Sequence, residues 1–186
     1  MLNLFRLALV VATVFALAGC YMTAKPIITP ANAAWPFTSG TAFKSYSWKE
    51  DKNAWALSGG GTIVRVGDHY RLHPDPEPGQ AADPGDDMDF LLADLGGGYY
   101  AAQAEDKENH TILMDIAKVE GDTVYQYVLM CEAPDKAFVA RGIIDKFDDG
   151  RYSDTCIVSS LDQLRRAFQA KLAAGMIPHG KYVIAR

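Results

Sequence analysis

The chain has 186 residues, of which 49% are hydrophobic, 11% aromatic and 22% charged, and its 23 acidic and 18 basic residues give a formal net charge of -5. This composition is typical of a single globular domain. It excludes a disordered chain, a coiled coil, a protein with several membrane spans and a protein that holds nucleic acid through an overall basic surface.

The first 19 residues are predicted to be a secretory signal peptide. Arg6 supplies a positive charge before an apolar run, Leu7 to Ala18, which is short for a membrane-spanning helix. The run ends in Leu17-Ala18-Gly19-Cys20, which resembles the lipobox of bacterial lipoproteins. The resemblance implies cleavage before Cys20, a diacylglycerol on its sulfur, and acylation of the new amino group by a chain such as palmitate.

The resemblance also implies where the protein is sorted. Because Tyr21 rather than an aspartate follows Cys20, we expect the outer membrane, with the protein facing the periplasm. Two alternatives remain open: Cys20 is an ordinary residue of a signal or anchor helix, or cleavage follows the A-x-A sequence Ala31-Asn32-Ala33 and releases a soluble protein. The expected partners are the membrane, bound through the lipid on Cys20, and an envelope protein or glycan. Nucleic acid is not an expected partner.

The chain after the signal peptide is predicted to contain a tether and one domain. Residues 20–36 include three prolines and a run of small residues, so we expect a lipidated N-terminus followed by a flexible tether. Residues 37–186 are expected to form a single globular domain.

Short β-rich runs separated by turn residues fill most of this domain. The first is Thr41–Trp48, and Gly59–Gly61 is predicted to be a turn after it. Residues 74–87, rich in proline and acidic side chains, are expected to form an exposed loop. Three hairpins are predicted, which pair residues 62–66 with 69–73, 89–95 with 99–105, and 111–119 with 123–130.

Helices are expected only late in the chain. Residues 134–141 are predicted to form a short helix, and residues 160–174 a longer one, in which Ser160 and Gln163 make a capping box before an apolar face. Short extended runs are expected at 143–147, 155–158 and 181–184. The predicted fold class is therefore α+β, an antiparallel β meander or barrel-like sheet of about six to eight strands with two helices late in the chain.

Two cysteines, Cys131 and Cys156, remain besides Cys20. In an oxidising compartment they are expected to form a disulfide, with buried free thiols as the alternative. Their spacing is not the C-x-x-C of redox pairs, and zinc would need further ligands nearby.

No sequence motif identifies a catalytic residue, a metal site or a cofactor. His69 and His73 share one face of a predicted strand and, with Asp75, are the best candidates for a metal site. The acidic loop does not match the spacing of a calcium loop, and Ser160 lacks a G-x-S-x-G motif. We therefore expect a non-enzymatic binding or structural module of the cell envelope. The alternative is a metal-dependent or hydrolytic enzyme that acts on envelope material.

Overall fold

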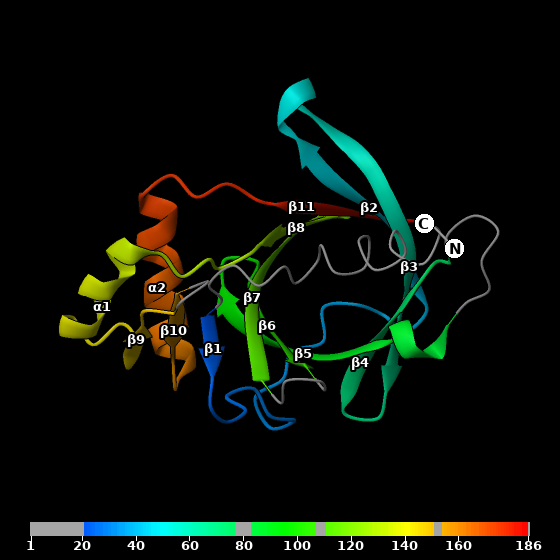
Figure 1. The fold of residues 1–186 in the computed structure, drawn as a ribbon. Coiled ribbons are helices and arrows are strands. Elements are labelled where there is room, and N and C mark those ends of the chain that lie inside the picture. Colours follow the sequence, from blue (N-terminus) through cyan, green and yellow to red (C-terminus); the bar gives the residue numbers. More distant parts are fainter. Residues whose placement is uncertain (1–20, 77–82, 107–110, 151–153, 186) are drawn as a thin grey trace, which may run out of the picture.

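A computed structural model describes residues 21–76, 83–106, 111–150 and 154–185 (Figure 1). The strands in these ranges are β1 (Tyr21–Thr23), β2 (Thr41–Lys49), β3 (Ala54–Val66), β4 (His69–Pro74), β5 (Met88–Gly96), β6 (Tyr99–Asp106), β7 (Thr111–Glu120), β8 (Thr123–Tyr127), β9 (Lys146–Asp148), β10 (Thr155–Ile157) and β11 (Gly180–Ile184). The α-helices are α1 (Ala137–Ala140) and α2 (Leu161–Ala173), and short 3-10 helices cover Glu50–Lys52, Pro84–Asp86 and Ala133–Lys136.

Eight strands form a closed antiparallel barrel. They follow one another in the order β6-β5-β4-β3-β2-β11-β8-β7, and β7 pairs with β6 to complete the circle. The last strand closes the gap, since Tyr182 of β11 lies opposite Ser45 of β2 on one side and Val124 of β8 on the other. The predicted barrel-like antiparallel sheet with two helices late in the chain is confirmed.

The two ends of the barrel differ in their connections. At one end, here called the turn end, tight turns join β3 to β4, β5 to β6, and β7 to β8. Gly67, Gly97 and Gly121 in these turns have φ angles of 61°, 64° and 60°, which glycine adopts at little cost. The opposite end, here called the loop end, carries longer connections, and from it the hairpin of β2 and β3 projects beyond the barrel (Figure 1).

The main cluster of buried apolar residues lies between the barrel and the elements outside it. The ring of Phe168 in α2 meets Tyr99 of β6 at 5.2 Å and Tyr127 of β8 at 5.4 Å between ring centroids. β1 joins the edge of β7 and pairs with β10, which pairs with β9. We call α2, β1 and residues 24–34 the outer layer, because they cover the outer face of the barrel.

Local sequence signals explain α2 and its attachment. The hydroxyl of Ser160 accepts a hydrogen bond from the backbone N–H of Gln163 at 3.2 Å, as expected for an N-cap. The helix ends before Gly175, which has a φ of 93°. Cys131 and Cys156 form a disulfide with a Cα–Cα distance of 5.5 Å, which joins the chain after β8 to β10. Neither helix of the described residues is long and apolar enough to cross a membrane.

The prediction of a tether is wrong for residues 21–36. Tyr21 and Ile28 have no exposed surface, and the side chain of Gln103 holds the backbone of this segment. Its carbonyl oxygen accepts from the N–H groups of Ile27 and Ile28, both at 2.9 Å, and its amide nitrogen donates to the carbonyl of Ile28 at 3.0 Å. The segment therefore has a fixed conformation despite its prolines and small residues, because apolar and backbone contacts bind it to the barrel.

Two further expectations need correction. Gly59–Gly61 is not a turn but part of β3, which runs through all three glycines. A Cβ on Gly60 would lie 2.9 Å from the carbonyl oxygen of Phe43, and one on Gly61 would lie 3.1 Å from the Cα of Pro74, so close approach of neighbouring strands explains these glycines. The strand predicted over 123–130 ends at Tyr127, where the chain leaves the barrel toward the outer layer.

We expect Ile28→Ala to lower the free energy of unfolding by about 2 to 5 kcal/mol, because it empties a fully buried site. Chemical denaturation of the purified protein measures the change. Lys25→Ala, in the same segment but exposed, is the matched control and should have little effect. Equal stability of both variants and the native protein would mean that this segment is a free tether.

Candidate functional site

The inner face of the barrel is the candidate site. Because side chains alternate between the two faces of a strand, the strand registers place one set of residues inside, and the rings of Phe43 and Tyr182 meet there at 5.4 Å. The inward-facing set includes Phe43, Ile63, Tyr70, Leu72, Phe90, Leu92, Ala102, Ala104, Leu113, Asp115, Ala117, Val124, Gln126, Tyr182 and Ile184.

Part of the barrel interior is less completely buried than the outer layer, although inward-facing Phe43, Tyr70, Leu92 and Val124 are buried. Ala101 and Ile116, which face the outer layer, have no exposed surface. Their inward-facing neighbours Ala102, Asp115 and Ala117 are only half-buried. Solvent therefore reaches the part of the interior near these residues. The interior of an eight-stranded barrel is either filled by its side chains or holds one small ligand.

Three polar side chains form a chain of hydrogen bonds inside this largely apolar space. The hydroxyl of Tyr182 on β11 donates to the amide oxygen of Gln126 on β8 at 2.7 Å. The amide nitrogen of Gln126 donates to a carboxylate oxygen of Asp115 on β7 at 2.9 Å. Asp115 also accepts from the backbone N–H of Leu129. The three residues come from the neighbouring strands β7, β8 and β11.

Burial shifts the protonation of both acids in this chain. It raises the pKa of Asp115 to about 6, against the smaller lowering effect of its bonds to Gln126 and to the backbone of Leu129. Burial likewise raises the pKa of Tyr182 to about 12, and the Asp115 charge adds to the shift. At neutral pH the interior therefore holds a carboxylate beside a neutral phenol. Among the described residues, no cationic side chain contacts this carboxylate.

Residues 34–40 cover the turn end of the barrel. The N–H of Ala34 donates to the carbonyl of Leu92 at 2.7 Å, and Trp35 packs edge-on against Tyr70 at 5.1 Å. The Tyr70 hydroxyl donates to the carbonyl of Phe37 at 2.8 Å, and Tyr70 has no exposed surface. The Arg65 guanidinium lies 3.8 Å from the Trp35 ring centroid. These contacts cover the turn end of the barrel.

The histidines singled out from the sequence do not form a metal site with Asp75. His69 and His73 share the outer face of β4, as predicted, but Arg71 stands between them and binds Asp89 through two bonds of 2.7 and 3.0 Å. His73 pairs with Asp87 at 2.7 Å. Since a fixed guanidinium repels a metal ion, this row is better explained as ion pairs on the surface.

The positions of the other candidates argue against separate sites. The ligand-type atoms of Cys131, Asp135 and Cys156 lie within 4.8 Å of one another, but the disulfide occupies both sulfurs, and Asp135 is paired with Lys171 at 2.8 Å. Ser160 serves as an N-cap. Cys20 and residues 77–82 of the acidic loop lie outside the described residues.

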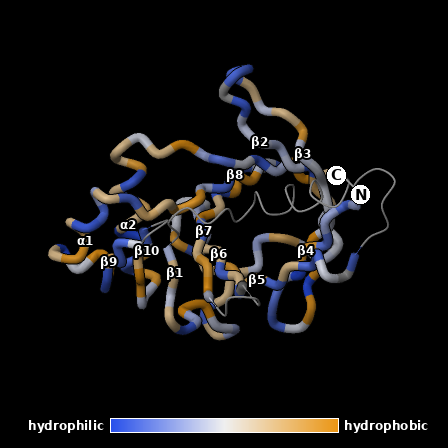
Figure 2. Tube along the Cα trace, viewed as in Figure 1, coloured by the Kyte–Doolittle hydropathy of each residue, from blue (hydrophilic) through white to orange (hydrophobic). Residues whose placement is uncertain are grey.

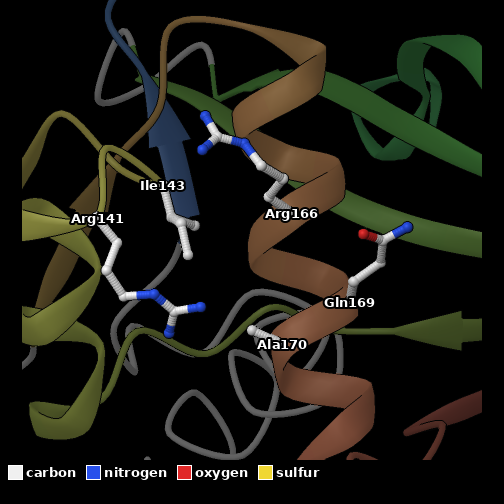
Figure 3. A pocket seen from close by; sticks show the side chains of 5 residues that line it. All are labelled: Arg141, Ile143, Arg166, Gln169 and Ala170. Atoms are coloured by element: carbon white, nitrogen blue, oxygen red, sulfur yellow. The ribbon is translucent and has the colours of Figure 1, made fainter.

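A surface pocket of about 390 Å³ lies between α2 and the chain after α1 (Figure 3). Arg141 and Arg166 both border it. The Arg166 guanidinium already binds Asp162 at 2.9 Å and the carbonyl of Gly142 at 2.8 Å. One of the two charges that border this pocket is therefore already engaged.

Sequence reasoning missed Asp115, Gln126 and Tyr182. The one available signal was that Asp115 interrupts an apolar strand, between Met114 and Ile116. Such a residue is ordinarily assigned to the solvent face. A comparison of the chain with protein-family models, curated proteins and solved structures finds no match.

We expect Asp115→Asn to stabilise the protein in a pH-dependent way. The raised pKa means that the folded state holds the proton more tightly than the unfolded state, so native stability falls as pH rises from about 4 to about 6. The variant lacks this loss. Its free energy of unfolding should exceed the native value by on the order of 2 kcal/mol at pH 8 and match it at pH 4. Urea denaturation at both pH values checks this, and an identical difference at the two would contradict it.

Proposed function

We propose that the protein is a lipid-anchored module of the cell envelope whose barrel binds a small, mostly apolar molecule that carries a protonated amine or a hydroxyl group. The observation that carries the proposal is the inward-facing Asp115 carboxylate. It lies among apolar and small side chains, in contact with Gln126, without a cation beside it in the described part of the chain.

The chemistry of the ligand follows from this carboxylate. A buried charge without a partner is costly, and a hydrogen-bond donor or a cation reduces the cost. The surrounding inward side chains, such as Phe90 and Leu113, offer apolar contact to the rest of the molecule. Gln126 and Tyr182 hold Asp115 in place, which favours binding over bond-breaking chemistry.

The anchor is proposed from the lipobox-like sequence that ends in Cys20. Lipidation at this residue would hold the barrel at a membrane, because two or more acyl chains give stable attachment. We place the protein at the outer membrane, on the periplasmic side, in keeping with Tyr21 as the following residue. An envelope protein or a glycan remains a further partner that this arrangement allows.

Enzymatic activity is not proposed. The alternative of a metal-dependent or hydrolytic enzyme depended on His69, His73 and Asp75. His69 and His73 each pair with a carboxylate, and Arg71 lies between them. No specific observation on the described residues therefore favours a metal site there.

Ligand binding is tested with a dansyl-labelled alkylamine and its uncharged alkyl analogue as fluorescent probes. Ala117→Leu fills the interior and should weaken binding of both probes at least about tenfold, which corresponds to about 1.4 kcal/mol. Asp115→Asn should weaken the amine about tenfold and the uncharged analogue much less. Ala42→Leu, the same substitution at an exposed outward position, is the control and should leave both affinities unchanged.

Two outcomes would count against interior binding. One is saturable binding that Ala117→Leu leaves intact while thermal unfolding shows the variant to be folded. The other is a combination of two results. The native protein binds neither probe, and native mass spectra of protein purified from the cell envelope show no retained small molecule.

The anchor is tested by labelling cells with a radioactive fatty acid. The native protein should incorporate the label, and Cys20→Ala should not, because it removes the thiol to which the lipid is attached. Mass spectrometry of the mature N-terminus provides the second readout. A mature protein that begins after Ala33 would show that cleavage occurs at the A-x-A sequence instead.

A further inference from the structure

The mature N-terminus of a protein lipidated at Cys20 would have almost no free chain between lipid and fold. The backbone N–H of Tyr21 donates to the carbonyl of Leu129 at 3.2 Å, and the Tyr21 side chain is fully buried. Consecutive Cα atoms are about 3.8 Å apart. A lipid on Cys20 would therefore leave the protein directly beside Leu129, just past the end of β8.

The strand registers place this point at the loop end, next to two other segments. Gly180, the first residue of β11, lies opposite Gln126 near the end of β8 and opposite Ser47 on β2. The connection from α2 to β11 and the hairpin of β2 and β3 therefore leave the barrel at the same end as residues 128–130. Since neighbouring strands are about 4.8 Å apart, β2 is only two strand spacings from β8.

The two most exposed large apolar side chains of the described residues lie in these segments. Leu57 on β3 is 63% exposed, and Ile177 in the connection before β11 is 62% exposed. Ile177, Met176, Met130 and Val128 also border a pocket of about 300 Å³. Figure 2 shows apolar residues along the connection from α2 to β11 and a hydrophilic tip on the hairpin.

The outer face of the hairpin adds aromatic rings and a lysine. Trp48 and Trp55 meet edge-on at 5.4 Å. The Lys181 ammonium lies 5.0 Å from the Tyr46 ring centroid and 5.3 Å from that of Trp55. Tryptophan, tyrosine and lysine side chains favour the boundary between lipid headgroups and acyl chains, because each has an apolar body and a polar end.

We propose that this surface, formed by Tyr46, Trp48, Trp55, Leu57, Ile177 and Lys181, lies flat against the lipid bilayer. The inference rests on the proposed lipid anchor, since the point where the chain leaves the fold toward Cys20 adjoins the surface. The hairpin lies along the membrane rather than entering it tip first, because its tip carries Lys49, Asp51 and Lys52. The protein has a net negative charge, so apolar and aromatic contacts rather than overall attraction to anionic lipid make the contact.

The positions of the three tryptophans provide a direct test. Trp48 and Trp55 lie on the proposed surface, whereas Trp35 covers the turn end. Lipidated protein is reconstituted into phosphatidylcholine vesicles with brominated acyl chains, which quench fluorescence at short range. Trp35→Phe, which keeps Trp48 and Trp55, should be quenched strongly. The double variant Trp48→Phe/Trp55→Phe, which keeps Trp35, should show little quenching and is the matched control.

The possible outcomes distinguish failure of the membrane-facing surface from failure of the lipid anchor. Lipidated, vesicle-bound protein whose Trp48 and Trp55 are not quenched would overturn the membrane-facing surface and leave the anchor intact. Absence of the fatty acid label would overturn the anchor. The orientation is then tested with unlipidated Cys20→Ala protein and excess vesicles. Quenching of Trp48 and Trp55 but not Trp35 supports the membrane-facing surface, and any other pattern rejects it. Ile177→Ser should reduce vesicle binding of this unlipidated protein severalfold.

Discussion

The pairing of β11 with both β2 and β8 is the constraint on which the other features depend. Without β11, those two strands would be open edges and the sheet would have no inside. β11 also brings Tyr182 to Gln126, which completes the hydrogen-bond chain to Asp115. The strand follows α2 in the sequence, so the element that closes the barrel comes after the helix of the outer layer.

Stability and the candidate site are placed on opposite faces of the same strands. Ile116 on β7 faces the outer layer and is fully buried, whereas Asp115 beside it faces the interior and is half-buried. Burial of apolar surface against α2 and residues 24–34 therefore supports the fold. The interior holds a carboxylate with a raised pKa on the opposite face of β7.

The sequence predicts those features that local chemistry determines. Glycines with positive φ define the three tight turns, and Ser160 defines the start of α2. Barrel closure pairs Phe43 with Ile184, residues too distant in sequence for any local pattern to indicate their contact. The outer layer also reverses the usual interpretation of alternation, since Met114 and Ile116 of β7 face outward beneath other elements and polar Asp115 faces inward. Residues 21–36 were misjudged for the same reason, because only the tertiary contacts of Gln103 reveal that they are fixed.

The burial of Tyr21 bears on the cleavage proposed before Cys20. A protease that cuts before Cys20 must bind the residues on both sides of the bond in an extended, accessible chain. In the finished fold, Tyr21 is buried and its N–H is bonded to Leu129. If the leader is cleaved before Cys20, as proposed, a precursor that completed folding first would hide that cleavage site. On this proposal, docking of β1 between β7 and β10 would be a late step, and removal of the leader would precede the final strand pairing.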